Sequence, residues 1–114
     1  MNKIINKQNA SNYTWGNNCL SWILNNSEAL SIKQEIMPAK TKEHLHFHEN
    51  ASQFFYILKG QAMFYLAGDK LLLNSNNGLS VINNTKHFIA NESNETLEFL
   101  VISQPSSNND RINI

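Results

Sequence analysis

The sequence predicts an all-β fold of the jelly-roll or barrel type, and three observations lead to this prediction. Apolar and polar residues alternate with the period of two that half-buried strands show. The 3.6-residue period of an amphipathic helix is missing along almost the whole chain. The candidate strands are short, and clusters of Asn, Gly and Pro separate them. Seven or more short strands at such close spacing are typical of a sandwich or barrel.

Two candidate strands precede a histidine-rich segment. Residues Leu20–Leu24 alternate in polarity before an Asn25–Asn26 turn. Residues Leu30–Met37 form the second strand, which Pro38 ends because proline has no N–H for a ladder hydrogen bond. A short helical turn is expected only at Glu28–Leu30.

The second half of the chain supplies the remaining strands and their turns. The expected strands cover residues 53–58, 61–66, 71–73, 79–82, 87–91 and 97–103. Gly60 permits a sharp corner, Ala67–Lys70 is a tight hairpin turn, and Asn74–Gly78 is a second turn. Pro105 ends the last strand, and the polar tail Ser106–Ile114 is expected to be only partly ordered.

Length and composition indicate one domain, residues 1–114, with its core at about 19–104 and an extension at each end. Nine basic and nine acidic residues cancel, which argues against nucleic acid or a membrane surface as a partner. The N-terminus has no apolar segment typical of a signal peptide, so a cytoplasmic location is expected. With Cys19 as the only cysteine, an intrachain disulfide and a Cys-rich zinc site are excluded.

Three of the four histidines lie in one short segment, and two of them are spaced to act together. Side chains at i and i+2 of a strand share a face, so His46 and His48 project together, about 7 Å apart along the backbone. A fold that pairs distant strands would bring His87 opposite them. The alternative is a metal-free barrel that uses these histidines for hydrogen bonding or proton transfer.

The pattern His46-x-His48-x4-Gln53-x6-Gly60 resembles the first sequence block of the cupin family, whose form is G-x5-H-x-H-x3–4-E-x6-G. Both spacings fit. Gln53 stands where most cupins have a metal-binding Glu, and Lys40 stands at the opening Gly.

The second cupin block, G-x5-P-x-G-x2-H-x3-N, is matched in part. Its marked positions fall here on Asn76, Ile82, Asn84, His87 and Asn91. The His and the final Asn match, whereas the Pro and both Gly do not. Gly78 is expected to serve the opening turn in a shifted register.

Within the cupins, the chain is similar to small bacterial single-domain proteins of unassigned activity. The shared features are the Trp15-Gly-x-x-Cys19 segment, the Gln53–Leu58 strand and an Asp110–Arg111 pair near the end. This resemblance implies a double-stranded β-helix, that is, a jelly-roll barrel. It also implies a homodimer in which the N-terminal strand extends a neighbour's sheet.

The same resemblance implies one divalent transition metal (Fe, Ni, Zn, Mn or Cu) held by His46, His48, Gln53 and His87. Four neutral ligands leave the ion its full charge, which favours an anionic substrate group and Lewis-acid chemistry. Up to two positions would stay open for water, dioxygen or substrate. Gln53 could instead be a buried amide whose hydrogen bonds its neighbours satisfy.

Several other side chains receive less specific expectations. His44 shares the parity of the metal-site pair but lies outside the family spacing, so a rim or exposed position is expected, and Glu49 is expected to be a solvated loop charge. Met63 and Tyr65 are expected to face the interior and Phe88 the outside. Asp110 and Arg111 are expected to form an ion pair that clamps the tail.

The function expected from this resemblance is a metal-dependent enzyme that acts on a small molecule in an oxygenase-like (dioxygenase) reaction, with Tyr56 or Tyr65 donating a proton. One alternative is a non-catalytic barrel that binds or senses a sugar, an amino-acid-like molecule or another small anion. A metal-assisted isomerase or lyase is the other.

Overall fold

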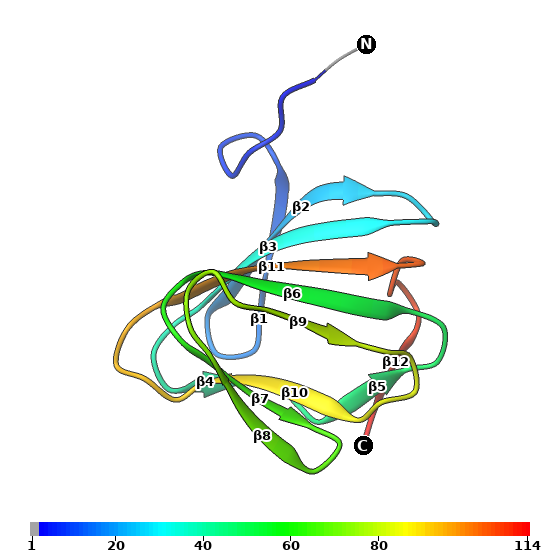
Figure 1. The fold of residues 1–114 in the computed structure, drawn as a ribbon. Coiled ribbons are helices and arrows are strands. Elements are labelled where there is room, and N and C mark those ends of the chain that lie inside the picture. The colour runs from blue at the N-terminus through cyan, green and yellow to red at the C-terminus, as the bar shows by residue number, and fades with distance from the viewer. Residues whose placement is uncertain (1–2) are drawn as a thin grey trace.

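The computed structural model describes residues 3–114, and it confirms the predicted all-β jelly-roll fold. Two antiparallel sheets of six and five strands face each other, with one further short strand beside the second sheet (Figure 1). Met1 and Asn2, which belong to the predicted domain 1–114, lie outside the described residues. Between residues 3 and 114 there is no helix, and hence none of the length and apolarity that crossing a bilayer requires. The helical turn expected at Glu28–Leu30 is wrong, because Ser27 N–H donates to the Leu30 carbonyl and closes a bend there.

The strands of the two sheets come from distant parts of the chain. The first sheet has the order β1 (Ser11–Trp15), β2 (Cys19–Asn26), β3 (Ser31–Met37), β11 (Leu97–Gln104), β6 (Ser52–Lys59) and β9 (Gly78–Val81). The second has the order β12 (Arg111–Asn113), β5 (His46–His48), β10 (His87–Asn91), β7 (Ala62–Leu66) and β8 (Asp69–Leu73), and β4 (Thr41–Lys42) pairs with β10 beside it.

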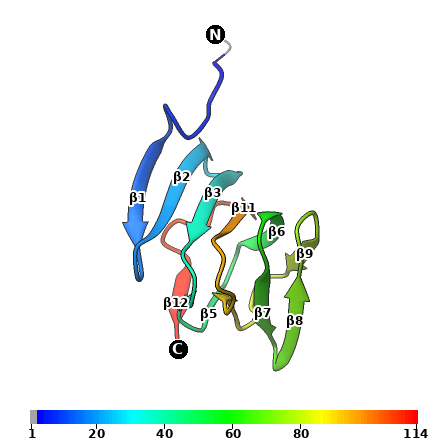
Figure 2. The same ribbon diagram turned by 90° about the vertical axis from the view of Figure 1, so that its left-hand side faces the viewer.

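Ordered strands extend beyond the predicted core at both ends. At the N-terminal side, β1 pairs antiparallel with β2 over its whole length and forms the edge of the first sheet (Figure 2). At the other end, β12 pairs with β5, so the polar tail Ser106–Ile114, which was expected to be only partly ordered, contains a strand over Arg111–Asn113. Both extensions contribute residues to the pocket described below.

The core lies between the two sheets and consists of alternate residues of each strand. Phe55 and Ile57 of β6 are buried there, as their parity predicts. On β7 it is Phe64 that is buried, whereas Met63 and Tyr65 are only half-buried. The expected parity of β7 is therefore wrong: a shift of one residue after the Gly60 corner moves every side chain of a strand to the other face.

Left-handed backbone occurs at the three positions where the two cupin blocks carry glycine and this chain does not. Lys40, Asn76 and Asn84 have φ angles of 62°, 69° and 63°. Asn enters this region more readily than most residues, so the local turns persist without glycine. Gly78 has no positive φ and opens β9, so the expectation that it replaces the opening glycine is wrong.

Gly60 is a position where the fold requires glycine. Its φ is +87°, and a Cβ there would lie 2.5 Å from the Thr96 carbonyl oxygen. This contact with backbone leaves no space for a side chain, which explains why the last glycine of the first block is retained.

Candidate metal centre

The three histidines singled out by the sequence meet between the sheets. The antiparallel pairing of β5 with β10 places His87 opposite His46. The His46 ring lies 4.4 Å from the His87 ring and 5.1 Å from the His48 ring, and His48 and His87 are 5.8 Å apart, between centroids. One nitrogen of each ring lies within 4.8 Å of the others, and all three side chains are buried. The predicted convergence of these residues is confirmed, and the cluster can hold a metal ion.

Backbone carbonyls fix which nitrogen of each ring carries the proton. The Nδ1 atom of every ring lies at hydrogen-bond distance from a carbonyl oxygen. These pairs are His46 with His44 (2.7 Å), His87 with Thr85 (2.8 Å) and His48 with Asp110 (3.1 Å). A carbonyl only accepts, so Nδ1 must donate, and the neutral ring then keeps its lone pair on Nε2. Metal-binding histidines show the same arrangement, with the second ring nitrogen bound to a carbonyl or carboxylate.

The free nitrogens are buried and ready to bind a cation. Nε2 of His48 and Nε2 of His87 have no hydrogen-bond partner among residues 3–114. Burial lowers the pKa of His48 and of His87, and it lowers the pKa of His46 to about 3 despite the opposing effect of the His44 carbonyl. The three imidazoles are therefore neutral at pH 7, as ligands must be.

Gln53 approaches from the opposite sheet with one half of its amide unused. Its Nε2 donates to Ser103 Oγ on the neighbouring strand at 3.0 Å. Its Oε1 is buried and has no partner within residues 3–114. The reading of Gln53 as a fully satisfied buried amide thus accounts for its nitrogen only. A buried oxygen without a hydrogen-bond donor destabilises the fold, and a bound cation would remove this cost. Three imidazole nitrogens and one amide oxygen fit a divalent transition metal.

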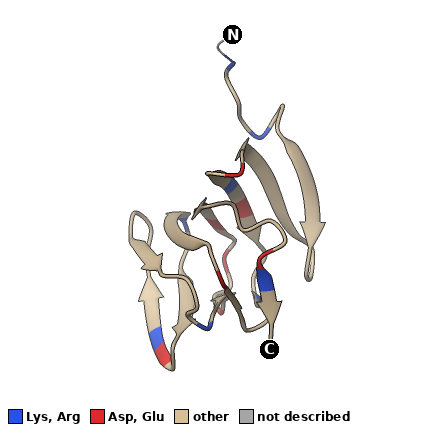
Figure 3. Ribbon diagram, turned by 90° about the vertical axis from the view of Figure 1, so that its right-hand side faces the viewer, with Lys and Arg blue, Asp and Glu red and all other residues tan. Residues whose placement is uncertain are grey.

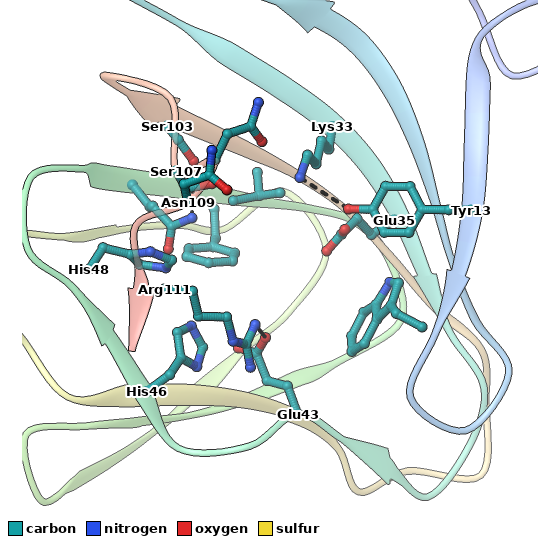
Figure 4. A pocket seen from close by; sticks show the side chains of 15 residues that line it. Tyr13, Lys33, Glu35, Glu43, His46, His48, Ser103, Ser107, Asn109 and Arg111 are labelled. Atoms are coloured by element: carbon teal, nitrogen blue, oxygen red, sulfur yellow. Dashed lines mark hydrogen bonds and ion pairs between the residues drawn. The ribbon is translucent and has the colours of Figure 1, made fainter. Parts of the chain in front are cut away.

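A pocket of about 310 Å³ opens beside these residues (Figure 4). Its walls come from β1, β3, the segment that leads into β5 together with β5, β6, β11 and the C-terminal tail. They include His46, His48, Gln53, Phe55, Glu43, Lys33, Glu35, Tyr13, Trp15, Arg111 and residues 107–109. In Figure 4 the Arg111 side chain extends toward His46 and Glu43, and Lys33 is joined to Tyr13 by a 3.0 Å hydrogen bond. The pocket is large enough for a small molecule next to the histidines.

The two tyrosines expected to donate protons do not line this pocket. Tyr56 has the opposite parity to Gln53 on β6, and its hydroxyl donates to Asn76. Tyr65 stacks on the outward-facing Phe88 with ring centroids 4.4 Å apart, and its hydroxyl donates to Glu92. Strand alternation directs both side chains away from the histidines, so the structure does not support a catalytic role for either.

Two charged residues that sequence reasoning did not assign to the site lie there instead. The Glu43 side chain is only 11% exposed, and the Arg111 guanidinium lies 3.5 Å from its carboxylate. Burial raises the Glu43 pKa from its usual 4.5 to about 7, although Arg111 and the Ile89 N–H oppose this change. A carboxylate three residues before a histidine pair was a signal that could have identified Glu43. Arg111 gave no local signal, because the tail reaches the site only through β12.

The raised pKa of Glu43 predicts how substitution changes the pH dependence of stability. Glu43 protonates more easily in the folded than in the unfolded chain, so its contribution to stability is present below pH 4.5 and is lost as the pH rises through 7. Metal-free Glu43→Gln should gain stability relative to the parent protein over this range, by at most about 3 kcal/mol. Urea unfolding at pH 4.5 to 8 measures this difference, with exposed Glu49→Gln as control. Identical profiles for both variants would contradict it.

The remaining single-residue expectations have different outcomes. His44 and Glu49 are exposed, as expected. Asp110 and Arg111 do not pair with each other: Arg111 pairs with Glu43, whereas the Asp110 carboxylate accepts three backbone N–H groups. Cys19 is a buried free thiol whose pKa burial raises, as an inert apolar residue requires.

Comparison with known proteins supports the fold and places the family. The cupin domain, as a sequence family, matches residues 33–103. Uncharacterized protein MJ1618 of Methanocaldococcus jannaschii is 29% identical over 75 residues, which make up 66% of this chain. The matched region spans only 60% of that curated relative.

Solved structures with low identity share the architecture. An RmlC-like cupin from Shewanella frigidimarina has a TM-score of 0.85 at 13% identity, covering 96% of both chains. A predicted oxalate decarboxylase from Thermotoga maritima has a TM-score of 0.83 at 19% identity, covering 91% of this chain and all of that one. The polyketide cyclase RemF from Streptomyces resistomycificus has a TM-score of 0.79 at 14% identity, covering 93% of this chain and 81% of that one. With the sequence match over 33–103, this chain belongs to the cupin family.

Proposed function

We propose that this protein is a metal-dependent enzyme that acts on a small anionic molecule in an oxygenase-like reaction. The observation that carries the proposal is the set of unpaired donor atoms at one place. Nε2 of His48, Nε2 of His87 and Oε1 of Gln53 are all buried without a partner in the described chain, and the His46 ring lies 5.1 Å from the His48 ring and 4.4 Å from the His87 ring, between centroids. Buried polar atoms are normally paired, so several together indicate a bound ion.

The residues around the centre favour an anionic substrate. Lys33 and Arg111 bring two cationic groups to the pocket wall. Glu35 and Glu43 line the same wall, and burial raises the pKa of both carboxyl groups, which favours their uncharged form. Lys33 has no carboxylate within ion-pair distance among residues 3–114. A bound divalent metal would supply Lewis-acid chemistry and, as Fe(II), dioxygen chemistry. Arg111 can orient a substrate carboxylate through its planar fork of donors.

Glu43 favours a second candidate, a metal-assisted isomerase or lyase. Its carboxyl group lines the pocket, and its pKa of about 7 lets it take or release a proton at neutral pH. A reaction that moves a proton on a carbonyl-bearing acid would use this group directly.

Metal-loading experiments test the proposal and separate the candidates. Metal-free protein is loaded anaerobically with Fe²⁺, Mn²⁺, Ni²⁺, Cu²⁺ or Zn²⁺, and oxygen uptake is followed with thiols, diketones, phenols and small carboxylic acids. We expect uptake with Fe²⁺ only. Conversion without uptake, detected by mass spectrometry, would support the isomerase or lyase instead. A compound that raises the melting temperature and is recovered unchanged would indicate a binding barrel, and failure to bind any metal would refute the proposal.

The expected assembly and location remain proposals as well. The outer side of β1 has no partner strand within residues 3–114, and such an edge can pair with the same strand of a second copy. We therefore propose a homodimer formed through this edge. The cytoplasmic location expected from the sequence is proposed separately.

A further inference from the structure

The C-terminal segment reaches the metal centre from outside the region that matches the cupin family. Strand β12 pairs antiparallel with β5, with Arg111 opposite His48 and Asn113 opposite His46. The Ile114 N–H continues this contact by donating to the Leu45 carbonyl at 3.1 Å. The match to the cupin sequence family ends at residue 103, so β12 lies beyond the matched residues.

Asp110, the residue before β12, holds the loop that connects two of the proposed ligands. Its Oδ1 accepts the Glu49 N–H at 3.0 Å. Its Oδ2 accepts the Asn50 N–H at 3.0 Å and the Ala51 N–H at 2.8 Å. These three peptide groups directly follow His48 and precede Gln53 by two residues. One carboxylate thus fixes the backbone between His48 and Gln53.

The main chain of the same residue holds the His48 ring. The Asp110 carbonyl oxygen accepts from His48 Nδ1 at 3.1 Å, across 62 positions of sequence. The other two rings have local partners two residues earlier in the chain, His44 for His46 and Thr85 for His87. Only the His48 ring depends on a distant segment for its orientation.

We propose that Asp110 is a positioning residue for the metal centre: its carboxylate anchors the 49–51 turn so that its carbonyl holds His48 with Nε2 directed to the metal. The Asp110 side chain determines the position of the tail backbone. The Asp110 carbonyl then accepts from His48 Nδ1 and so determines the tautomer of the His48 ring. The inference rests on the proposed metal function, because a metal is what the positioned His48 ring would bind. The contact between Asp110 and the His48 ring is present without metal.

The test compares Asp110→Ala with Asp69→Ala, which removes the same charge from an exposed hairpin position. Co²⁺ is the probe, followed by its visible absorption and by calorimetry. We expect Asp110→Ala to weaken Co²⁺ binding by about 10- to 100-fold, as loss of a group that orients a ligand does, and Asp69→Ala to leave it unchanged. Nitrogen NMR of the metal-free protein should show a changed tautomer at His48 and unchanged rings at His46 and His87.

An unchanged His48 ring, with Co²⁺ affinity within about twofold of the parent protein, would overturn the inference. If the parent protein itself binds no Co²⁺, the proposed function fails, and the NMR comparison alone decides the role of Asp110. If Asp110→Ala does not fold, Asp110→Asn replaces it. That variant keeps the size and one acceptor oxygen, and it should produce a smaller change confined to the same ring.

Discussion

His46→Ala is expected to weaken binding of a divalent transition metal by more than about 100-fold, because loss of a direct ligand costs more than loss of a group that orients one. His46 is the ring nearest to both of the others, at 4.4 and 5.1 Å between centroids. Removing it leaves two histidines and one amide oxygen as ligands. These three donors hold the ion less tightly, because water replaces them at the metal more easily. Calorimetric titration with Co²⁺ or Ni²⁺, combined with elemental analysis of the purified protein, measures the effect.

His44→Ala provides the matched control for this prediction. It is the same substitution two residues earlier, in the segment that leads into β5, and His44 is exposed and lies outside the cluster. The contact of His44 with the His46 ring uses the backbone carbonyl, which alanine retains. Equal metal affinities for the two variants would show that the three-histidine cluster is not the binding site.

Asn91→Asp is expected to destabilise the fold by roughly 3–5 kcal/mol, because each buried group left without a partner costs about 1–3 kcal/mol. Asn91 is fully buried at the end of β10. Its Nδ2 lies 2.8–3.2 Å from the carbonyl oxygens of Met37, Pro38 and Glu95. Its Oδ1 accepts from the backbone and the hydroxyl of Ser93. The substitution keeps the shape but places a carboxylate oxygen against three carbonyl oxygens.

Urea unfolding of Asn91→Asp measures this loss, with Asn94→Asp as the control. Asn94 is exposed in the loop that follows the same strand, and its replacement should change stability by less than about 0.5 kcal/mol. The new buried carboxylate should be less damaging at acidic pH, where it can take up a proton. A difference of under about 1 kcal/mol between the two variants would show that the Asn91 amide does not hold the β3–β4 corner to the 91–95 loop.

The hydrogen bonds of the Asn91 amide explain the Asn position that ends the second cupin sequence block. The sequence identifies Asn91 by its spacing from His87 but does not show what the side chain does. The structure shows that the amide joins the end of β3, the start of the next turn and the loop after β10. Asn91 is therefore a structural residue of the site region, and the metal centre depends on it only through the fold.

The pattern of alternating residues predicted most of the strands, and it failed where a turn changed the register. On β6 the parity of Gln53, Phe55 and Ile57 was predicted correctly. On β7, after the Gly60 corner, the parity was wrong, and Tyr65 faces outward. Alternation fixes which residues share a face, but the turn decides which face is buried. For this reason Tyr65 was misplaced while the two histidines of β5 were not. Tyr56 has the opposite parity to Gln53, so the correct parity of β6 itself directs Tyr56 away from the site.

The sequence by itself determined the all-β class, the shared face of His46 and His48, and Gln53 as their partner in the pattern, because these features depend on neighbours within one strand and its turn. Only the tertiary structure decided that Glu43 and Arg111 line the pocket, that Asp110 holds His48, and that Nε2 is the free nitrogen of the His48 ring. These features require contacts between segments as much as 68 residues apart. The spacing of residues along a chain contains no information on such contacts until strand pairing brings the segments together.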